Sequence, residues 1–128
     1  MTSLERHNPR LSFRPSTRED IENLAGPDKL DFTIRAITFL VDNIPSGIGG
    51  IQYVRHGFLA FCDISKDVMI SKASIVRCGL EVMNMIKSMG AYPVYAIRDA
   101  EKKNAERFLK SMGFEPYPGE ERFYIWTR

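Results

Sequence analysis

The last third of the chain carries the pattern that most constrains its fold. A short apolar run, Pro93 to Ile97, is followed by Asp99, a residue type that commonly caps helix N-termini. An amphipathic helix of about three turns is expected next. It ends at Gly113, where a helix C-terminus favours a left-handed residue, and an alternating strand from Arg122 to Trp126 closes the unit. This strand–helix–strand ending predicts an α/β domain.

The first half of the chain predicts a run of strands. Leu11 to Arg14 is a short strand, and Ser16–Thr17 begins a helix that Gly26–Pro27 ends. Asn43 to Ser46 is the expected turn of a hairpin. Three segments rich in β-branched and aromatic residues form an antiparallel meander; they are Thr33–Asp42, Ile48–Val54 and Phe58–Ile64.

The period of the apolar residues changes after this meander. From about Val68 to Met89 they recur at spacings of three and four, which indicates the longest helix of the chain, ended by Gly90. The predicted element order is therefore β-α-β-β-β-α-β-α-β. The buried face of the long helix is expected to consist of Met69, Ala73, Val76, Leu80, Met83 and Ile86.

Composition limits the classes of function. The chain has 128 residues, and we expect a flexible basic arm over residues 1–10 and a single domain over residues 11–128. No apolar run approaches the roughly 20 residues needed to span a bilayer, and the polar N-terminus lacks a signal-peptide core. A net charge of +2 is too small to argue for nucleic acid. We therefore expect a cytoplasmic protein without a membrane or nucleic-acid partner.

Two further sequence features predict structure rather than chemistry. His7 and His56 have no ligand-like spacing to Cys62 or Cys78, so no metal site is expected. Both cysteines are expected to be reduced and packed as small hydrophobic residues. The glycine run over residues 47–50 lacks the helix context and the Lys-Ser/Thr ending of a phosphate loop, so we expect close packing within a strand.

Three segments, in this order, resemble the GNAT N-acetyltransferase superfamily. FRPSTREDIENLA is similar to the family's first strand and helix, and RAITFLVDNIPSGIGGI to its second and third strands. NAERFLKSMGF is similar to its fourth helix and the following glycine–aromatic pair. The resemblance runs from about Leu11 to Trp126 and is greatest to the small acetyltransferase-like proteins of tailed phages. It implies a mixed, mostly antiparallel sheet with helices on both faces.

The resemblance also implies a cosubstrate, acetyl-CoA, held where the fourth and fifth strands splay apart. In this family, backbone N–H groups at the start of the long helix hold the pyrophosphate. Lys72, Ile75 and Arg77 match the family's Arg/Gln, Gly and Gly/Ala positions, so two small residues are replaced here. The contacts to acetyl-CoA that the resemblance implies are Ile64, Ser71, Lys72, Ser74, Arg77 and Asn104.

Two residues are candidates for the catalytic base that the resemblance implies. Asp63 ends the fourth strand and Tyr95 lies in the fifth, and either would take a proton from the substrate ammonium through water. Each also has a structural interpretation: Asp63 as a carboxylate that caps the next turn, and Tyr95 as a half-buried packing aromatic. Leu109 stands where many family members have a tyrosine that protonates the leaving thiolate.

These residues leave two functions open. One is an enzyme that transfers the acetyl group of acetyl-CoA to an amine of unknown identity. The other is a catalytically inactive GNAT-fold protein that binds another protein, either as a phage virion or ejection component or as a regulator of a host protein. For a phage-encoded protein the expected location is the host cytoplasm or the virion.

Overall fold

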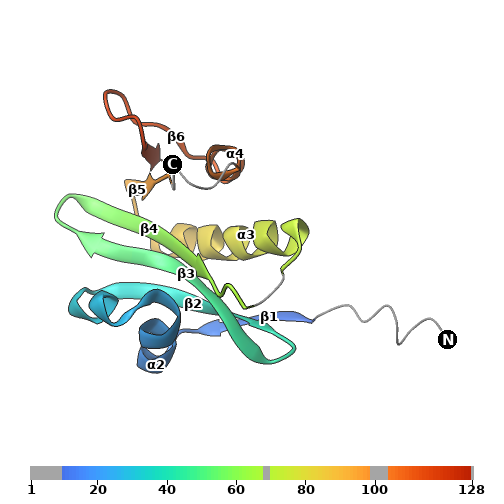
Figure 1. The fold of residues 1–128 in the computed structure, drawn as a ribbon. Helices are drawn as coiled ribbons and strands as arrows, with labels where there is room; N and C mark the ends of the chain where they lie inside the picture. Colours follow the sequence, from blue (N-terminus) through green and yellow to red (C-terminus); the bar gives the residue numbers. More distant parts are fainter. Residues whose placement is uncertain (1–9, 68–69, 99–103, 128) are drawn as a thin grey trace.

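A computed structural model describes residues 10–67, 70–98 and 104–127. Within these residues seven strands form one sheet in the order β1-β2-β3-β4-β5-β7-β6 (Figure 1). Neighbouring strands run antiparallel except β4 and β5, which are parallel. The strands are β1 Leu11–Pro15, β2 Ile34–Val41, β3 Ile44–Val54, β4 Gly57–Ile64, β5 Val94–Ile97, β6 Glu115–Pro116 and β7 Phe123–Trp126.

Helices cover the two faces of this sheet unequally. The long helix α3 and the shorter α4 pack on one face, while α2, η1 and η2 lie on the other, where η1 contacts β3 and β4 (Figure 1). The sheet is mixed and mostly antiparallel, as the family resemblance implies. The helices are α2 Arg18–Asp20, the π-helix η1 Ile21–Ala25, the 3-10 helix η2 Pro27–Asp31, α3 Lys72–Met89 and α4 Ala105–Ser111.

Glycines set the distance between the core layers. A Cβ atom at Gly49 of β3 would lie 2.7 Å from Cγ2 of Val82 on α3. A Cβ atom at Gly79 of α3 would lie 2.8 Å from Cζ of Phe108 on α4. Larger residues at either glycine would push a helix away from its neighbour. The close packing predicted for the glycine run of β3 is therefore confirmed.

The first half of α3 is rotated relative to the sequence-based prediction. Val76 and Leu80, predicted to be core residues, are 41% and 50% exposed. The buried positions in this half are Cys78 and Gly79. Phe108 of α4 fills the space beside Gly79. The contact between α3 and α4 is therefore made at Gly79, whereas the hydrophobic pattern predicted a core contact at Leu80. The second half follows the prediction, with Met83 and Ile86 buried.

The long helix also begins later than its apolar spacing suggests. Its first residue is Lys72, and the hydroxyl of Ser71 caps it. The predicted start at residues 68–69 lies outside the described residues, as does the predicted cap Asp99. At the other end Gly90 has a left-handed backbone with φ of 67°, which confirms the predicted C-terminus.

The turn between β2 and β3 lies earlier in the chain than predicted. Asp42 and Asn43 form it with φ angles of 52° and 68°, a conformation that Asp and Asn adopt more readily than most residues. As a result β3 begins at Ile44, and the predicted turn over residues 43–46 is wrong.

The structure shows which face of the C-terminal strand β7 is buried. Tyr124 and Trp126 are 3% and 8% exposed and belong to the core, while Phe123 is 38% exposed on the opposite face. β7 begins one residue later than predicted. Gly113 has a φ of 97°, which confirms the predicted left-handed residue beyond α4.

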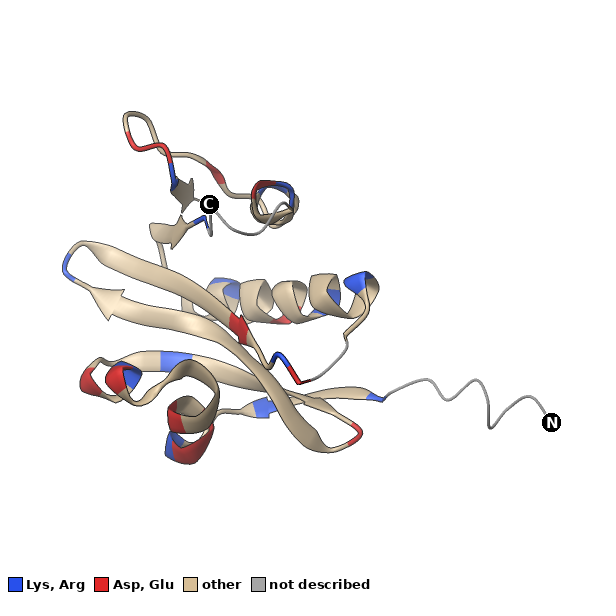
Figure 2. Cartoon of the chain, in the orientation of Figure 1, with Lys and Arg blue, Asp and Glu red and all other residues tan. Residues whose placement is uncertain are grey.

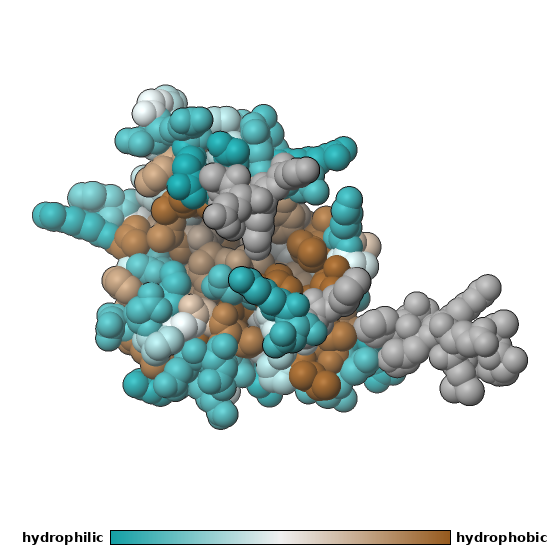
Figure 3. All heavy atoms as spheres, viewed as in Figure 1, coloured by the Kyte–Doolittle hydropathy of each residue, from teal (hydrophilic) through white to brown (hydrophobic). Residues whose placement is uncertain are grey.

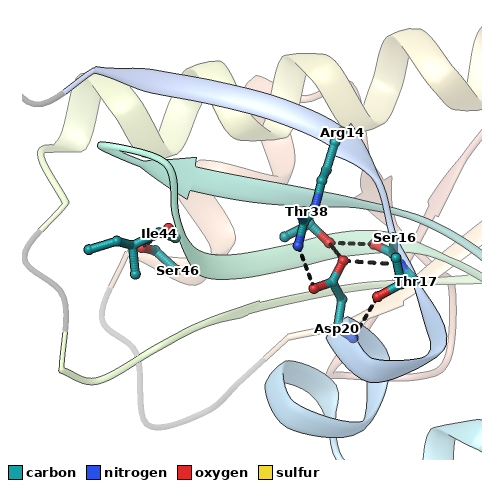
Figure 4. Close-up of polar contacts among 7 residues, drawn as sticks. All are labelled: Arg14, Ser16, Thr17, Asp20, Thr38, Ile44 and Ser46. Atoms are coloured by element: carbon teal, nitrogen blue, oxygen red, sulfur yellow. Dashed lines mark hydrogen bonds and ion pairs between the residues drawn. The ribbon is translucent and has the colours of Figure 1, made fainter.

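A buried polar network joins β1, α2 and β2 (Figure 4). The Asp20 carboxylate accepts hydrogen bonds from the Thr38 hydroxyl at 2.9 Å and from the Thr17 N–H at 3.0 Å, and it pairs with the Arg14 guanidinium at 2.9 Å. The Ser16 hydroxyl lies 2.8 Å from that of Thr38. Burial raises the pKa of Asp20, but these hydrogen bonds outweigh it and hold the pKa below its usual value of 3.8. The network fixes α2 against the sheet.

Candidate functional site

Strands β4 and β5 part soon after they pair. Their parallel ladder consists of two residue pairs, Phe58 with Val94 and Leu59 with Tyr95. Among the described residues β4 then continues beside β3 as far as Ile64, while β5 continues beside β7. The two strands therefore diverge toward their C-terminal ends, and the chain leaves β4 at this divergence to reach the start of α3 (Figure 1).

The first turn of α3 has spare hydrogen-bond donors. The Ser74 N–H donates to Ser71 Oγ at 3.1 Å, and the Ile75 N–H donates to the Ser71 carbonyl at 3.0 Å. Within the described part of the chain, the N–H groups of Lys72 and Ala73 have no hydrogen-bond partner. A long helix carries partial positive charge at this end, so two spare donors make it suited to an anion.

The structure does not bring Lys72 and Arg77 together. Five residues along an α-helix turn through about 500°, so the two side chains leave α3 about 140° apart. The Arg77 guanidinium carbon lies 5.8 Å from the ring centroid of Phe13 on β1, in cation–π contact. Lys72 lies two turns before Gly79 on the side of the helix that faces α4.

The half-buried Ile75 projects toward the sheet. It precedes the fully buried Ile86 by three turns of α3, so the two side chains point in nearly the same direction. The side chain at the family's glycine position therefore packs toward the sheet.

Two other implied contacts lie on separate elements. Ile64 is half-buried, and its Cδ1 atom would lie 2.8 Å from a Cβ atom at Gly47, so it packs over β3 on the α3 side. Asn104 is exposed and begins α4, where its carbonyl accepts the Phe108 N–H at 2.9 Å and its side chain makes no cap hydrogen bond.

The two candidate bases share a face of the sheet but lie far apart on it. Tyr95 pairs with Leu59, and Asp63 lies four residues further along β4, about 13 Å at the usual strand rise. Asp63 is exposed. Tyr95 is half-buried, and its ring packs edge-on against Tyr117 with a centroid distance of 6.0 Å. Because of this separation, one bound amine cannot contact both side chains.

Sequence reasoning missed a basic group on the same face. The Lys29 ammonium of η2 donates to Gln52 Oε1 at 3.0 Å and lies 4.8 Å from the ring centroid of Phe61 on β4. Gln52 is 7% exposed, so it needs this partner. No pattern in the sequence indicates η2. By contrast, the Ser71–Ser74 pair is a capping signal that would have located the start of α3.

The thiols contribute no chemistry that the site requires. Burial raises the pKa of Cys78 to about 11, so its thiol is protonated at neutral pH. Cys62 is exposed rather than packed as predicted, and neither cysteine forms a disulfide.

Among the described residues, no group of three or more His, Cys, Asp and Glu side chains is arranged to hold a metal ion. Within the same ranges, every helix is too short or too polar to cross a membrane.

Comparison with known proteins yields matches among solved structures. No family model and no curated protein sequence matches the chain. An acetyltransferase of the GNAT family from Streptococcus pneumoniae is 13% identical, with a TM-score of 0.64 over 91% of this chain and 96% of that chain. The Salmonella typhimurium protein yncA, solved with its cofactor acetyl-CoA, is 9% identical, with a TM-score of 0.65 over 90% of each chain.

A third similar structure contains a partner as well as a ligand. It is a variant of the AtaT toxin bound to the C-terminus of the antitoxin AtaR and to acetyl-CoA. It is 14% identical to this chain, with a TM-score of 0.55 over 91% of this chain and 92% of that chain. At such low identities the likeness concerns the fold. The chain has the mixed α/β fold of the GNAT acetyltransferases.

Proposed function

We propose that this protein is an N-acetyltransferase that uses acetyl-CoA. The observation that carries the proposal is the early parting of β4 and β5 beside a helix N-terminus with two spare N–H groups. Proteins of the same fold have been solved with acetyl-CoA bound. Acetyl-CoA combines an anionic pyrophosphate with a narrow extended arm, and these two parts suit a helix N-terminus and a gap between strands.

The proposed contacts follow from this arrangement. The N–H groups of Lys72 and Ala73 bind the pyrophosphate, and the Lys72 ammonium adds a charge-assisted contact. The hydroxyls of Ser71 and Ser74 lie in the same turn of α3 and are further donors. Among the described residues the β4–β5 ladder ends at Leu59 and Tyr95, and we place the extended arm along the part of β4 beyond it, up to Ile64. Asn104 is the proposed contact from α4.

The reaction is an acyl transfer between sulfur and nitrogen. The substrate ammonium loses a proton, through water, to Asp63 or Tyr95, and the neutral amine then attacks the thioester carbonyl carbon. The new C–N bond forms as the C–S bond breaks. The leaving thiolate takes a proton from water, because Leu109 stands where the family has an acid. The products are the acetylated amine and CoA with a free thiol.

Calorimetry with acetyl-CoA tests the proposal. We expect micromolar binding by the wild type and about tenfold weaker binding by Lys72→Ala, since a charge-assisted hydrogen bond contributes on the order of 1.5–3 kcal/mol. Arg77→Ala is the matched control, because it removes the same charge from the same helix on the side that contacts Phe13. It should weaken binding less. High salt should weaken wild-type binding through screening.

The absence of binding at millimolar acetyl-CoA would contradict the proposal. The second candidate, a GNAT-fold protein without turnover that binds a virion or host protein, would then account better for the chain. A gain of binding in an Ile75→Gly, Arg77→Gly variant would support that outcome, because it would identify the start of α3 as a closed remnant of a cosubstrate site.

A further inference from the structure

Among the helices of the described residues, none lies over one face of the β5–β7 part of the sheet. Paired residues of neighbouring strands point to the same side, so the register shows which side chains share this face. Leu59, Tyr95, Ile125 and Glu115 form one row across β4, β5, β7 and β6. Ile97 and Phe123 form the next row, extended by Tyr117, whose N–H donates to the Phe123 carbonyl at 2.9 Å. We call Tyr95, Ile97, Tyr117, Phe123 and Ile125 the open face.

The open face is apolar but not covered by the described residues. Ile97, Tyr117 and Phe123 are 49%, 39% and 38% exposed. The helices on this side of the sheet lie over β3 and β4, where η1 makes its contacts. Figure 3 shows hydrophobic residues at the surface of the molecule in this view, interrupted by hydrophilic ones. Exposed apolar surface of this kind marks a binding site more often than chance.

The charges around the open face are mostly negative. Glu115 lies in the same row as Tyr95, and Glu120 and Glu121 lie in the turn of the β6–β7 hairpin (Figure 2). Arg98 and Arg122 alternate to the other face, where the hydrogen bond and charge of Lys110 and, to a smaller extent, the Arg98 charge lower the pKa of Glu106 on α4. Across the divergence of β4 and β5, the exposed acids of α2, η1 and η2 are Glu19, Glu22, Asp28 and Asp31.

The open face borders the proposed reaction site. Tyr95 is the last residue of β5 that pairs with β4, and Ile97 lies beyond it on the part of β5 that has left β4. Basic side chains occur on α3, where Lys72 starts the helix, so the polyanionic cosubstrate and a cationic acceptor would approach surfaces of opposite charge. The rings of Tyr95, Tyr117 and Phe123 attract both another aromatic ring and an ammonium group.

From this juxtaposition we infer the substrate class: the open face binds the acetyl acceptor, a primary amine carried on an apolar, ring-bearing body. The inference rests on the proposed function for its chemistry. The ring of the acceptor packs on Tyr117 and Phe123, and its ammonium group points toward Tyr95 at the divergence of β4 and β5. The Glu115 charge, two strands away in the same row, attracts it over a longer distance. The ammonium proton passes through water to Asp63 or Tyr95, and the neutral nitrogen forms the amide bond with the acetyl carbon. The C–S bond of the thioester breaks, and the leaving thiolate takes a proton from water.

The test compares amines that differ in their body. We expect phenethylamine to be acetylated with a kcat/KM at least about tenfold above that of ethanolamine or spermidine, since aromatic contacts of this kind act in addition to area burial. Tyr117→Ala should raise the KM for phenethylamine about three- to tenfold and leave the KM for acetyl-CoA unchanged. Tyr117→Phe keeps the ring and should restore the KM. Glu115→Gln should raise the KM for phenethylamine more at low salt than at high salt.

Tyr53→Ala is the matched control. Tyr53 is 41% exposed and packs edge-on against Phe58 with a centroid distance of 5.1 Å, so it resembles Tyr117 in exposure and in ring contact. It lies on the opposite face of the sheet, because its neighbour Gln52 faces η2. We expect wild-type KM values for both substrates in Tyr53→Ala. If Tyr117→Ala does not fold, it will lack a cooperative thermal transition. The KM values of Tyr117→Phe and Glu115→Gln would then decide whether the open face binds the amine.

Binding of phenethylamine alone, followed by NMR shift changes, separates the two proposals. Binding that Tyr117→Ala weakens supports the open face even if acetyl-CoA does not bind, and in that case the proposed function fails by itself. Equal or better use of ethanolamine or spermidine would overturn the inference. So would a wild-type dimer in sedimentation analysis that Tyr117→Ala converts to a monomer, because a second copy of the chain would then cover the face.

Discussion

Helices cover the two halves of the sheet to different extents. Over β2–β4, α3 lies on one face and η1 on the other, and even the polar residues Thr38 and Gln52 are buried with hydrogen-bond partners. Over β5–β7 the described residues cover the α4 side alone, and the apolar Ile97 and Phe123 are exposed. The covered half contributes a rigid support, and the half-covered part leaves apolar surface beside the divergence of β4 and β5.

This difference shows that polarity alone does not reveal which face of a strand is buried. In β3 a glutamine faces inward because Lys29 of η2 reaches it. In β7 a phenylalanine faces outward because no described helix covers it. Both exceptions depend on elements that lie far away in the sequence. Stability is expected to depend mainly on the covered layers, and the following predictions test this contrast.

The largest effect is expected in the core beneath α3. Ile86 is fully buried, so Ile86→Ala should lower the free energy of unfolding by about 2–5 kcal/mol. Leu80→Ala, on the same helix at a half-exposed position, should stay within about 1 kcal/mol of wild type. Urea unfolding at neutral pH measures both. Equal losses at the two positions would show that α3 is rotated from the orientation described.

A smaller loss is expected in the polar network of the covered half. Asp20→Asn should cost about 1–3 kcal/mol, because one of the donors that face the carboxylate then meets an NH₂ group. Glu19→Gln, an exposed acid in the same turn, should change stability by no more than about 0.5 kcal/mol.

The pH dependence of the unfolding free energy provides a sharper test of the Asp20 network. Its pKa in the folded protein lies below the usual 3.8, so the carboxylate stabilises the fold at pH values above 3.8. This contribution is lost as the pH falls through the folded pKa. The difference in unfolding free energy between wild type and Asp20→Asn should therefore be constant near neutral pH and shrink in acid. A difference that grew on acidification would contradict the network.

The smallest effect is expected on the open face. Phe123→Ser should change the unfolding free energy by no more than about 1 kcal/mol, because the ring is already partly in water. Its neighbour Tyr124, 3% exposed on the covered side, provides the contrast: Tyr124→Ala should cost about 3 kcal/mol or more. Thermal unfolding of the two variants compares the faces directly. A large loss in Phe123→Ser would mean that this face is covered in solution.

Local pattern in the sequence predicted the longer strands and helices and their order, but not β6 or η2. Alternation located the strands, spacing of three and four located α3, and Gly90 and Gly113 marked helix ends because only glycine adopts their left-handed backbone cheaply. The candidate site was located only coarsely. The family resemblance pointed to the start of the long helix, and the capping Ser71 placed that start within the segment predicted to be helical.

The tertiary structure determined which faces of the helices and strands are buried, and the periodicity of apolar residues does not predict this. The α3 face was set by Gly79, whose missing side chain admits Phe108 from a helix 29 positions later in the chain, so Leu80 was left at the surface. The packing of α3 on the sheet placed Arg77 against Phe13 of β1. The open face arose because α2, η1 and η2 follow β1 and return to β2, and so cover β3 and β4 but not β5 and β7. Each of these outcomes depends on packing between distant segments, whereas a sequence pattern reports only on neighbours along the chain.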